Sequence, residues 1–425
     1  MTERLLQYIW QFQYYNNGHL QTTEGEPLQI LQSGTYNTNQ GPDFLNAKIR
    51  SGETTWAGNI EMHINASDWE IHEHSQDKNY SNIILHVVWK NDAVIALPFP
   101  TLELQERVSS ILLKKYEELM QSTLFIPCQQ HIRKVSTLTF IAWKERLLVE
   151  RLQQRALHIQ SLLAKNNQHW EESFWWMLAK NFGAKINADA FEKIAQTIPV
   201  TILAKHKNQV QQLEALLMGQ AAMLDKNFEE DYPAMLRREY IFLQKKYSLQ
   251  KAHAPLYFLR MRPANFPTIR LAQLAALIQQ SQHLFSIIKE AIHLDDIKKL
   301  LSVTANDYWH YHYRFEEETS FKKKILGQQM IQNILINTVV PVIYAYGYLN
   351  NNEAYKNKAL LWMEQITAEK NSITKGFQSL GVENKSAFDS QALIQLKNHY
   401  CNYKQCLQCA VGNQILKGGV EVNVQ

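Results

Sequence analysis

Two carboxylates and a histidine lie at a spacing that suits a divalent metal ion. Asp43 follows Pro42, and Glu61 and His63 come 18 and 20 residues later. If residues 55–64 form a strand, Glu61 and His63 project from the same face, because side chains alternate along a strand. Carboxylates hold Mg²⁺ or Mn²⁺ while several waters stay in place, and such an ion activates water against a phosphoryl group. The pattern predicts a phosphodiester-cleaving metal site.

A second group of polar residues follows closely along the chain. Its members are Asp68, His72, His74, Asp77 and His86. Asp68 and His72 are one helical turn apart and so share a face of any helix there. His86 lies in an apolar run, residues 83–89, where a buried histidine needs a hydrogen-bond partner. Histidine binds metals and carries protons, so the group without Asp68 is an alternative centre, for a different class of metallohydrolase.

Hydrophobic periodicity predicts the elements that must position these residues. An amphipathic helix is expected over residues 3–13, followed by strand-length runs that end at Gly, Pro or Asn-Asp. The expected strands are 28–36, 44–50, 55–64 and 82–90, with 98–104 as a short edge strand. The polar stretch 67–79 predicts a short helix, capped by Ser67 or Asp68. The order is therefore helix, three strands, helix, strand.

Beyond about residue 105 the periodicity becomes helical. Long amphipathic segments cover residues 107–121, 136–165, 209–223, 230–249, 271–282 and 321–349. These patterns predict an α+β protein. We expect a mixed-sheet module over residues 1–104 and an all-α region over residues 105–425 that carries a C-terminal cysteine cluster.

Charge is divided unevenly between these regions. Residues 1–104 contain 12 acidic and 5 basic side chains, whereas the remainder contains 28 and 39. A basic body joined to an acidic module suits nucleic acid as a partner, although both could simply be solvated surfaces. The longest apolar runs are too short for a membrane span, no secretory leader is apparent, and cysteines are sparse. We expect a cytoplasmic protein outside the membrane.

Motif and element order together resemble the PD-(D/E)xK nuclease superfamily. Pro42-Asp43 is similar to the PD element, and Glu61-Met62-His63 is similar to (D/E)xK, with His63 in place of the usual lysine. Histidine is not a fixed cation at neutral pH. Lys48, on the adjacent strand, is the substitute, although in a regular strand it points away from the face of Asp43. The resemblance implies a restriction-endonuclease-like core with Mg- or Mn-dependent catalysis by Asp43, Glu61, His63 and Lys48.

Gln76 and Tyr80 also match the QxxxY spacing of some exonuclease relatives of that superfamily. Longer stretches resemble an uncharacterised bacterial family, a domain of unknown function (DUF2851). They are residues 41–44, 56–63, 67–69, 84–88, 262–267 and the cysteine cluster. This resemblance covers essentially the whole chain. It implies family membership and brings no established activity.

Three of the four cysteines lie close together near the C-terminus. Cys401, Cys406 and Cys409 have the spacing C-x4-C-x2-C, and thiolates at such spacing converge on one metal ion or cluster. The fourth ligand would be Cys128 or His399. The arrangement resembles the iron–sulfur nucleases of the AddB kind, but Cys128 follows the predicted core rather than preceding it. Zinc, an iron–sulfur cluster and simple helix packing remain alternatives.

Three arginines, Arg260, Arg262 and Arg270, flank two prolines in a segment without helical periodicity. Proline stiffens a loop, so these arginines could bind nucleic-acid phosphates or pair with acidic side chains between helices. Three functions stay open. They are a metal-dependent nuclease or nuclease-derived processing protein, a non-catalytic nucleic-acid-binding or scaffold protein on that fold, and a different metallohydrolase.

Overall fold

The computed structural model describes residues 1–252, 254–281 and 283–418. The chain forms two compact units, which we name the sheet unit and the helical unit. The sheet unit comprises Met1–Trp143, Ser379–Gly381 and the stretch from Gln395. The helical unit comprises Lys144–Gln378 and Val382–Ile394. The helical unit is thus inserted into the sequence of the sheet unit.

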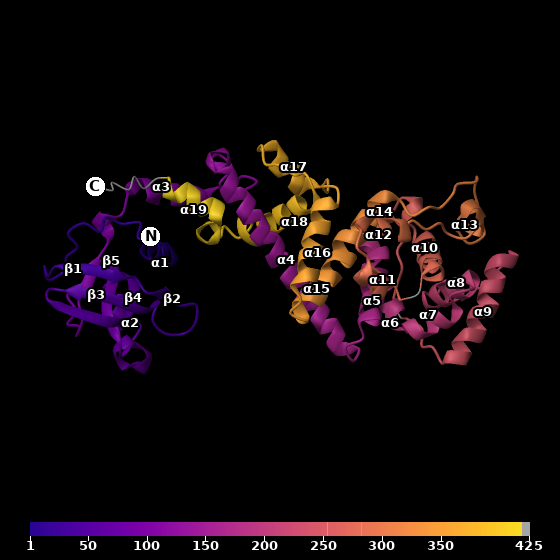
Figure 1. Ribbon diagram of the computed structural model, residues 1–425, viewed down its shortest axis with the longest axis horizontal. Coiled ribbons are helices and arrows are strands. Elements are labelled where there is room, and N and C mark those ends of the chain that lie inside the picture. Colours follow the sequence, from indigo (N-terminus) through magenta and orange to yellow (C-terminus); the bar gives the residue numbers. More distant parts are fainter. Residues whose placement is uncertain (253, 282, 419–425) are drawn as a thin grey trace. The chain divides into compact units, whose positions relative to one another are not determined.

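The sheet unit is built on a six-stranded mixed sheet, in which β1 to β5 are labelled in Figure 1. Its strands are β1 (Leu28–Gln32), β2 (Thr35–Tyr36), β3 (Phe44–Ser51), β4 (Thr54–Asn65), β5 (Ile83–Lys90) and β6 (Thr101–Glu103). The order is β1-β3-β4-β5-β6, with β2 paired to β3. The pairs β1–β3 and β3–β4 are antiparallel, whereas β4–β5 and β5–β6 are parallel. The expected order of helix, three strands, helix and strand is found with one difference: the expected strand 28–36 is divided into β1 and β2.

Strand β4 is positioned by close packing on both sides. Helix α1 (Glu3–Gln11) packs against it, and its N-cap Thr2 accepts a hydrogen bond from Leu5 N–H, as capping requires. On the β5 side, a Cβ at Gly58 would lie 2.5 Å from Ile84 Cγ2 and 2.6 Å from Asn82 O. Glycine therefore permits the close approach of β4 to the start of β5.

Parallel pairing of β4 with β5 requires a crossover connection. Residues 66–82 provide it through three short helical turns: α2 (Asp68–Ile71), η1 (His74–Gln76) and η2 (Lys78–Tyr80). Between the first two turns, Glu73 adopts a left-handed conformation with φ of 55°. The left-handed residue reverses the chain direction locally, so that residues on either side of it can face the same strand.

The C-terminal segment belongs to the sheet unit. Helix α19 (Ala410–Lys417) packs beside α3 (Ser110–Gln121), as Figure 1 shows. Lys115 Nζ donates to Ile415 O at 3.4 Å, and Ser136 N–H donates to Gln414 Oε1 at 3.2 Å. The division of the chain therefore differs from the expected boundary at residue 104, because these long-range contacts join residues 105–143 and the C-terminal segment to the sheet.

The helical unit consists of packed helices, as the periodicity predicts. Helix α4 (Thr137–Lys165) begins in the sheet unit and continues into the helical unit from Lys144. The next helices are α5 (Trp170–Phe182), α6 (Ala184–Gln196), α7 (Val200–His206), α8 (Val210–Gln220), α9 (Asp231–Tyr247), α10 (Pro267–Gln280), α11 (Leu284–Glu290) and α12 (Leu294–Leu300). The last are α13 (Tyr308–Tyr311), α14 (Gln328–Ile334), α15 (Val340–Leu349), α16 (Glu353–Gln365), α17 (Ser372–Ser379) and α18 (Ala387–Gln395).

Two local features of the helical unit differ from the sequence expectation. A short hairpin, β7 (His312–Arg314) with β8 (Glu317–Glu318), interrupts the helices. The helix expected from residue 321 starts at Gln328 instead and contains a π-helical turn, Leu335–Val339. The helical run Gln328–Leu349 has 22 residues and is apolar enough to cross a membrane, but 78% of its most apolar window is buried. Such burial is typical of a core helix.

The helical unit buries the carboxyl group of Glu214, and no ion pair joins it to a cation among the described residues. Glu214 of α8 is fully buried, and its Oε2 accepts hydrogen bonds from Tyr232 Oη at 2.8 Å and Trp309 Nε1 at 2.9 Å. Burial raises the pKa of Glu214 to about 7, whereas the two donors oppose that shift. The folded protein therefore holds this proton more tightly than the unfolded chain does.

Replacing Glu214 with glutamine is expected to remove part of the pH dependence of stability. The raised pKa of Glu214 means that its favourable contribution is present below the unfolded-state pKa and is lost as pH rises toward 7 and above. The loss is up to about 3 kcal/mol. Guanidinium unfolding at pH 5 and pH 8 should show a smaller difference for Glu214→Gln than for the wild type. The exposed Asp296→Asn serves as control, and an unchanged difference in Glu214→Gln would refute the assignment.

Candidate metal centre

Residues at the start of β3 and on β4 form the first part of the candidate site. Glu61 and His63 project from the same face of β4, with Glu61 Oε1 3.8 Å from His63 Nε2. Asp43, just before β3, donates its N–H to Glu61 Oε2 at 3.1 Å, and Asp43 Oδ2 accepts the N–H of Met62 at 3.1 Å. Gln7 of α1 donates to Asp43 Oδ1 at 2.8 Å. The structure thus brings Asp43, Glu61 and His63 together.

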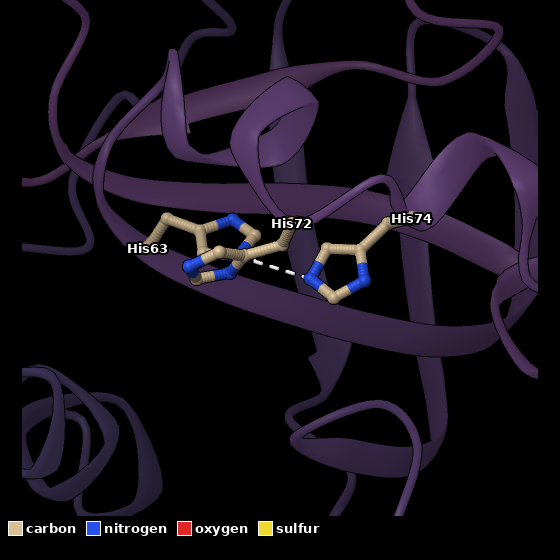
Figure 2. Close-up of side chains that lie close together, drawn as sticks. All are labelled: His63, His72 and His74. Atoms are coloured by element: carbon tan, nitrogen blue, oxygen red, sulfur yellow. Dashed lines mark hydrogen bonds between the residues drawn. The ribbon is translucent and has the colours of Figure 1, made fainter.

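The crossover brings two more histidines to His63. The Nε2 atom of His63 lies 3.1 Å from His72 Nδ1 and 3.3 Å from His74 Nε2. His74 Nε2 is also 3.5 Å from Glu61 Oε1. The ligand atoms of the three histidines all lie within 4.8 Å of one another. Figure 2 shows the three rings grouped together, with a hydrogen bond drawn to His74.

These separations fit the coordination sphere of one metal ion. Ligand atoms at 2.0–2.1 Å from a tetrahedral ion stand about 3.4 Å from one another. His72 Nδ1, His74 Nε2 and Glu61 Oε1 lie 3.1, 3.3 and 3.8 Å from His63 Nε2, and Glu61 Oε1 lies 3.5 Å from His74 Nε2. These four distances scatter around that value. His63 Nε2 faces two nitrogens and a carboxylate oxygen, and a single ring N–H can satisfy only one of them. A shared cation would satisfy all four donor atoms.

A further histidine supports His63 from behind. His86 of β5 is fully buried, and its Nε2 lies 2.9 Å from His63 Nδ1. If His63 Nε2 binds a metal, His63 Nδ1 carries the proton and donates it to His86, an orienting contact typical of metal-bound histidine. Trp69 packs edge-on against His63, and Tyr80 stacks on His74 with ring centroids 4.0 Å apart. Packing therefore fixes the ring orientations.

Burial favours the neutral form of His63, His74 and His86. Burial lowers the pKa of His63 to about 3 and that of His86 to about 4, and neighbouring histidines add to both shifts. Burial also raises the pKa of Glu61, and the charge of Asp43 adds to that shift. Burial likewise raises the pKa of Asp43, to about 7. Burial thus disfavours the charged form of Glu61 and Asp43, which lie beside neutral imidazoles. A bound cation would stabilise both carboxylates.

Three other expected site residues lie elsewhere. Asp68 accepts the N–H of Asn65 at 2.9 Å, and Asp77 caps η2 by accepting the N–H of Asn79 at 2.9 Å, so both stabilise the crossover. Lys48 is exposed and pairs with Ala57, four residues before Glu61 on β4. At about 3.3 Å per residue, that offset places Lys48 more than 10 Å along the strand from Glu61. Gln7 and Trp69 also contact site residues, but neither belongs to a chemical motif that the sequence would reveal.

The arginine segment does not form the expected three-arginine loop. Arg260 and Arg262 are exposed, whereas Arg270 is buried in the first turn of α10. Its guanidinium donates to Gln273 Oε1 and Asn265 Oδ1. The loop ends early because Pro267 occupies the first helical turn, where its fixed φ favours helix formation. Arg270 is therefore a packing residue rather than part of a phosphate grip.

Comparison with known proteins matches residues 3–372 to a family model described as a protein of unknown function (DUF2851). No curated protein and no solved structure matches the chain.

Proposed function

The chain belongs to the DUF2851 family, whose description states no activity, and from the site itself we propose that it is a metal-dependent hydrolase of phosphodiester bonds. One observation carries this proposal. The ligand atoms of His63, His72 and His74 lie within 4.8 Å of one another, and Glu61 Oε1 lies 3.8 Å from His63 Nε2 and 3.5 Å from His74 Nε2. Because His72 is exposed at the surface, a substrate could reach the ion, as catalysis requires.

The donor set favours some metals over others. Imidazole nitrogens suit Zn²⁺ and Fe²⁺, whereas Mg²⁺ and Mn²⁺ prefer carboxylate oxygens and water. Three nitrogens and one carboxylate oxygen therefore favour zinc over the magnesium or manganese that two carboxylates alone would suggest. A bound ion of this kind supplies Lewis acidity and lowers the pKa of a coordinated water.

Residues around the ligands would transfer a proton during catalysis and keep the ligands in position. Asp43, with its pKa raised to about 7 by burial, can accept or return a proton near neutral pH, as a general base or acid must. Gln7 fixes the Asp43 carboxyl group by donating to Oδ1. His86 fixes the tautomer of His63, and Tyr80 holds His74 in place.

Phosphodiesters are the proposed substrate class because of the topology around the site. An antiparallel β1-β3-β4 sheet, a crossover and a parallel β5 follow α1 in the order that the PD-(D/E)xK resemblance implies. Asp43 and Glu61 stand at the two acidic positions of that motif, and His63 stands at the lysine position. The excess of basic residues after residue 104 suits a nucleic-acid substrate.

A cleavage assay on the full chain tests the proposal. Single- and double-stranded DNA and RNA are incubated with Mn²⁺, Zn²⁺ or Mg²⁺. Zinc should support cleavage better than manganese or magnesium, and His72→Ala and Asp43→Asn should each lower the rate by about 100-fold or more. Glu53→Gln, an exposed acid in the β3–β4 turn, should leave the rate unchanged.

Other results would favour the competing functions. Metal binding with cleavage of other ester or amide substrates, but of no nucleic acid, would indicate a different metallohydrolase. A chain that binds nucleic acid but no divalent metal would be a non-catalytic scaffold. Circular dichroism of each variant establishes that the fold is retained.

A further inference from the structure

The sheet unit contains a second cluster of metal-binding side chains, remote from Glu61 in sequence. Cys128, Cys401, Cys406 and Cys409 line one small cavity together with Tyr400 and Gly412. All four carry free thiols. Three of them are buried and Cys401 is partly exposed. His399, the alternative fourth ligand, is exposed and does not line the cavity.

The backbone holds these cysteines firmly. Cys401 ends a π-helical turn, Leu396–Cys401, and Cys406 opens the 3-10 turn η8, Cys406–Gln408. Cys409 is the N-cap of α19. A Cβ at Gly412 would lie 2.2 Å from Cys406 O, so α19 packs directly on the backbone that carries Cys406. The positions of the thiols are therefore set by packed main chain, as a ligand site requires.

Hydrogen-bond donors and one lysine partly oppose the effect of burial on two of the four thiols. Burial raises the pKa of Cys409, whereas the N–H groups of Gly412 and Val411 and the indole of Trp143 act in the opposite direction. Burial and neighbouring cysteines raise the pKa of Cys401, and Lys397 opposes this. Hydrogen bonds to sulfur and nearby positive charge both stabilise metal-bound thiolate.

We propose that Cys128, Cys401, Cys406 and Cys409 ligate an iron–sulfur cluster. A single zinc ion, with bonds of 2.3 Å, holds its sulfurs about 3.8 Å apart. Cys401, Cys406 and Cys409 have the spacing C-x4-C-x2-C, and Cys128, distant in sequence, lines the same cavity. Three cysteines at this spacing with a fourth distant cysteine are a ligand set of iron–sulfur clusters. An iron–sulfur cluster is larger than one ion and is held by four cysteine thiolates.

The cluster would join distant parts of the chain within one unit. Cys128 lies between α3 and α4, and the other three ligands lie at the C-terminal end. Lys404, from the loop between Cys401 and Cys406, donates to Met120 O. The cluster would therefore lie in an interface that protein contacts already define.

The test is reconstitution of the full chain with ferrous iron and sulfide under nitrogen. His72→Ala is included in every sample, so that iron at the histidine centre does not contribute. The protein should turn brown, absorb at the blue end of the visible range, and bind iron and acid-labile sulfide in equal amounts. Cys406→Ser and Cys409→Ser should each lower both by about tenfold or more. His399→Ala should retain both.

Two results would overturn the proposal. One is colourless protein that takes up one equivalent of zinc and no sulfide. The other is a chain with all four cysteines that binds neither iron nor zinc after reconstitution. Both are read from the protein with its cysteines intact, so misfolding of a cysteine variant cannot decide the outcome.

Discussion

Replacement of His63 with alanine is expected to weaken Mn²⁺ or Zn²⁺ binding by at least about 100-fold, more than the loss of an outer-shell partner, which costs 10–100-fold. His63 Nε2 is the atom that contacts His72, His74 and Glu61. Without His63 Nε2, the metal loses the one ligand atom that lies close to the ligand atoms of all three other residues. Isothermal titration calorimetry of the full chain measures the effect.

Two further variants serve as an intermediate case and a control for this experiment. His86→Ala removes the support of His63 Nδ1 and should lower affinity by about 10–100-fold. His158→Ala changes an exposed histidine on α4 and should leave affinity unchanged. Affinity within threefold of wild type in His63→Ala would show that the histidines do not form one centre.

Loss of the cysteine-bound cluster is expected to destabilise the sheet unit by up to about 5 kcal/mol. The segment from Cys128 to Cys401 spans 273 residues, and a cross-link that closes a loop of this length removes about that much chain entropy from the unfolded state. Binding of the cluster is also part of the folding free energy. Guanidinium unfolding of the reconstituted protein and of Cys406→Ser should differ accordingly.

The exposed His399→Ala is the matched control for this comparison, because it changes a neighbouring residue outside the cavity. Hydrogen exchange should locate the loss in residues 396–417 and in α3, which pack together. Equal stability of Cys406→Ser and wild type, both reconstituted, would exclude a stabilising role for the cluster.

Strand periodicity predicted much of the sheet. The alternation that placed Glu61 and His63 on one face of β4 is found in the structure, and the expected limits of β3 and β5 are within one residue of those observed. Such patterns are reliable because one face of each strand must be buried. The same logic separated the helical region from the sheet.

Local backbone geometry was harder to predict. The convergence of His72 and His74 depends on left-handed Glu73, a conformation rare outside glycine, so the sequence indicated ligands but not their grouping with His63. Lys48 follows a bulge at Asn46, which has φ of 58°, and its expected direction assumed a regular strand. Arg270 was placed in a loop because Pro267 was interpreted as part of a loop instead of a helix start.

The insertion of the helical unit into the sheet unit imposes an order on synthesis. Residues 1–143 leave the ribosome well before residues from Gln395 onward, which complete the same unit. At about 5–20 residues per second, translation of the intervening segment takes roughly ten to fifty seconds. During that interval Cys128 and α3 lack the contacts that they make in the folded protein with the segment from Gln395 onward. The nascent sheet unit must therefore stay soluble, with an unprotected thiol, until α19 emerges.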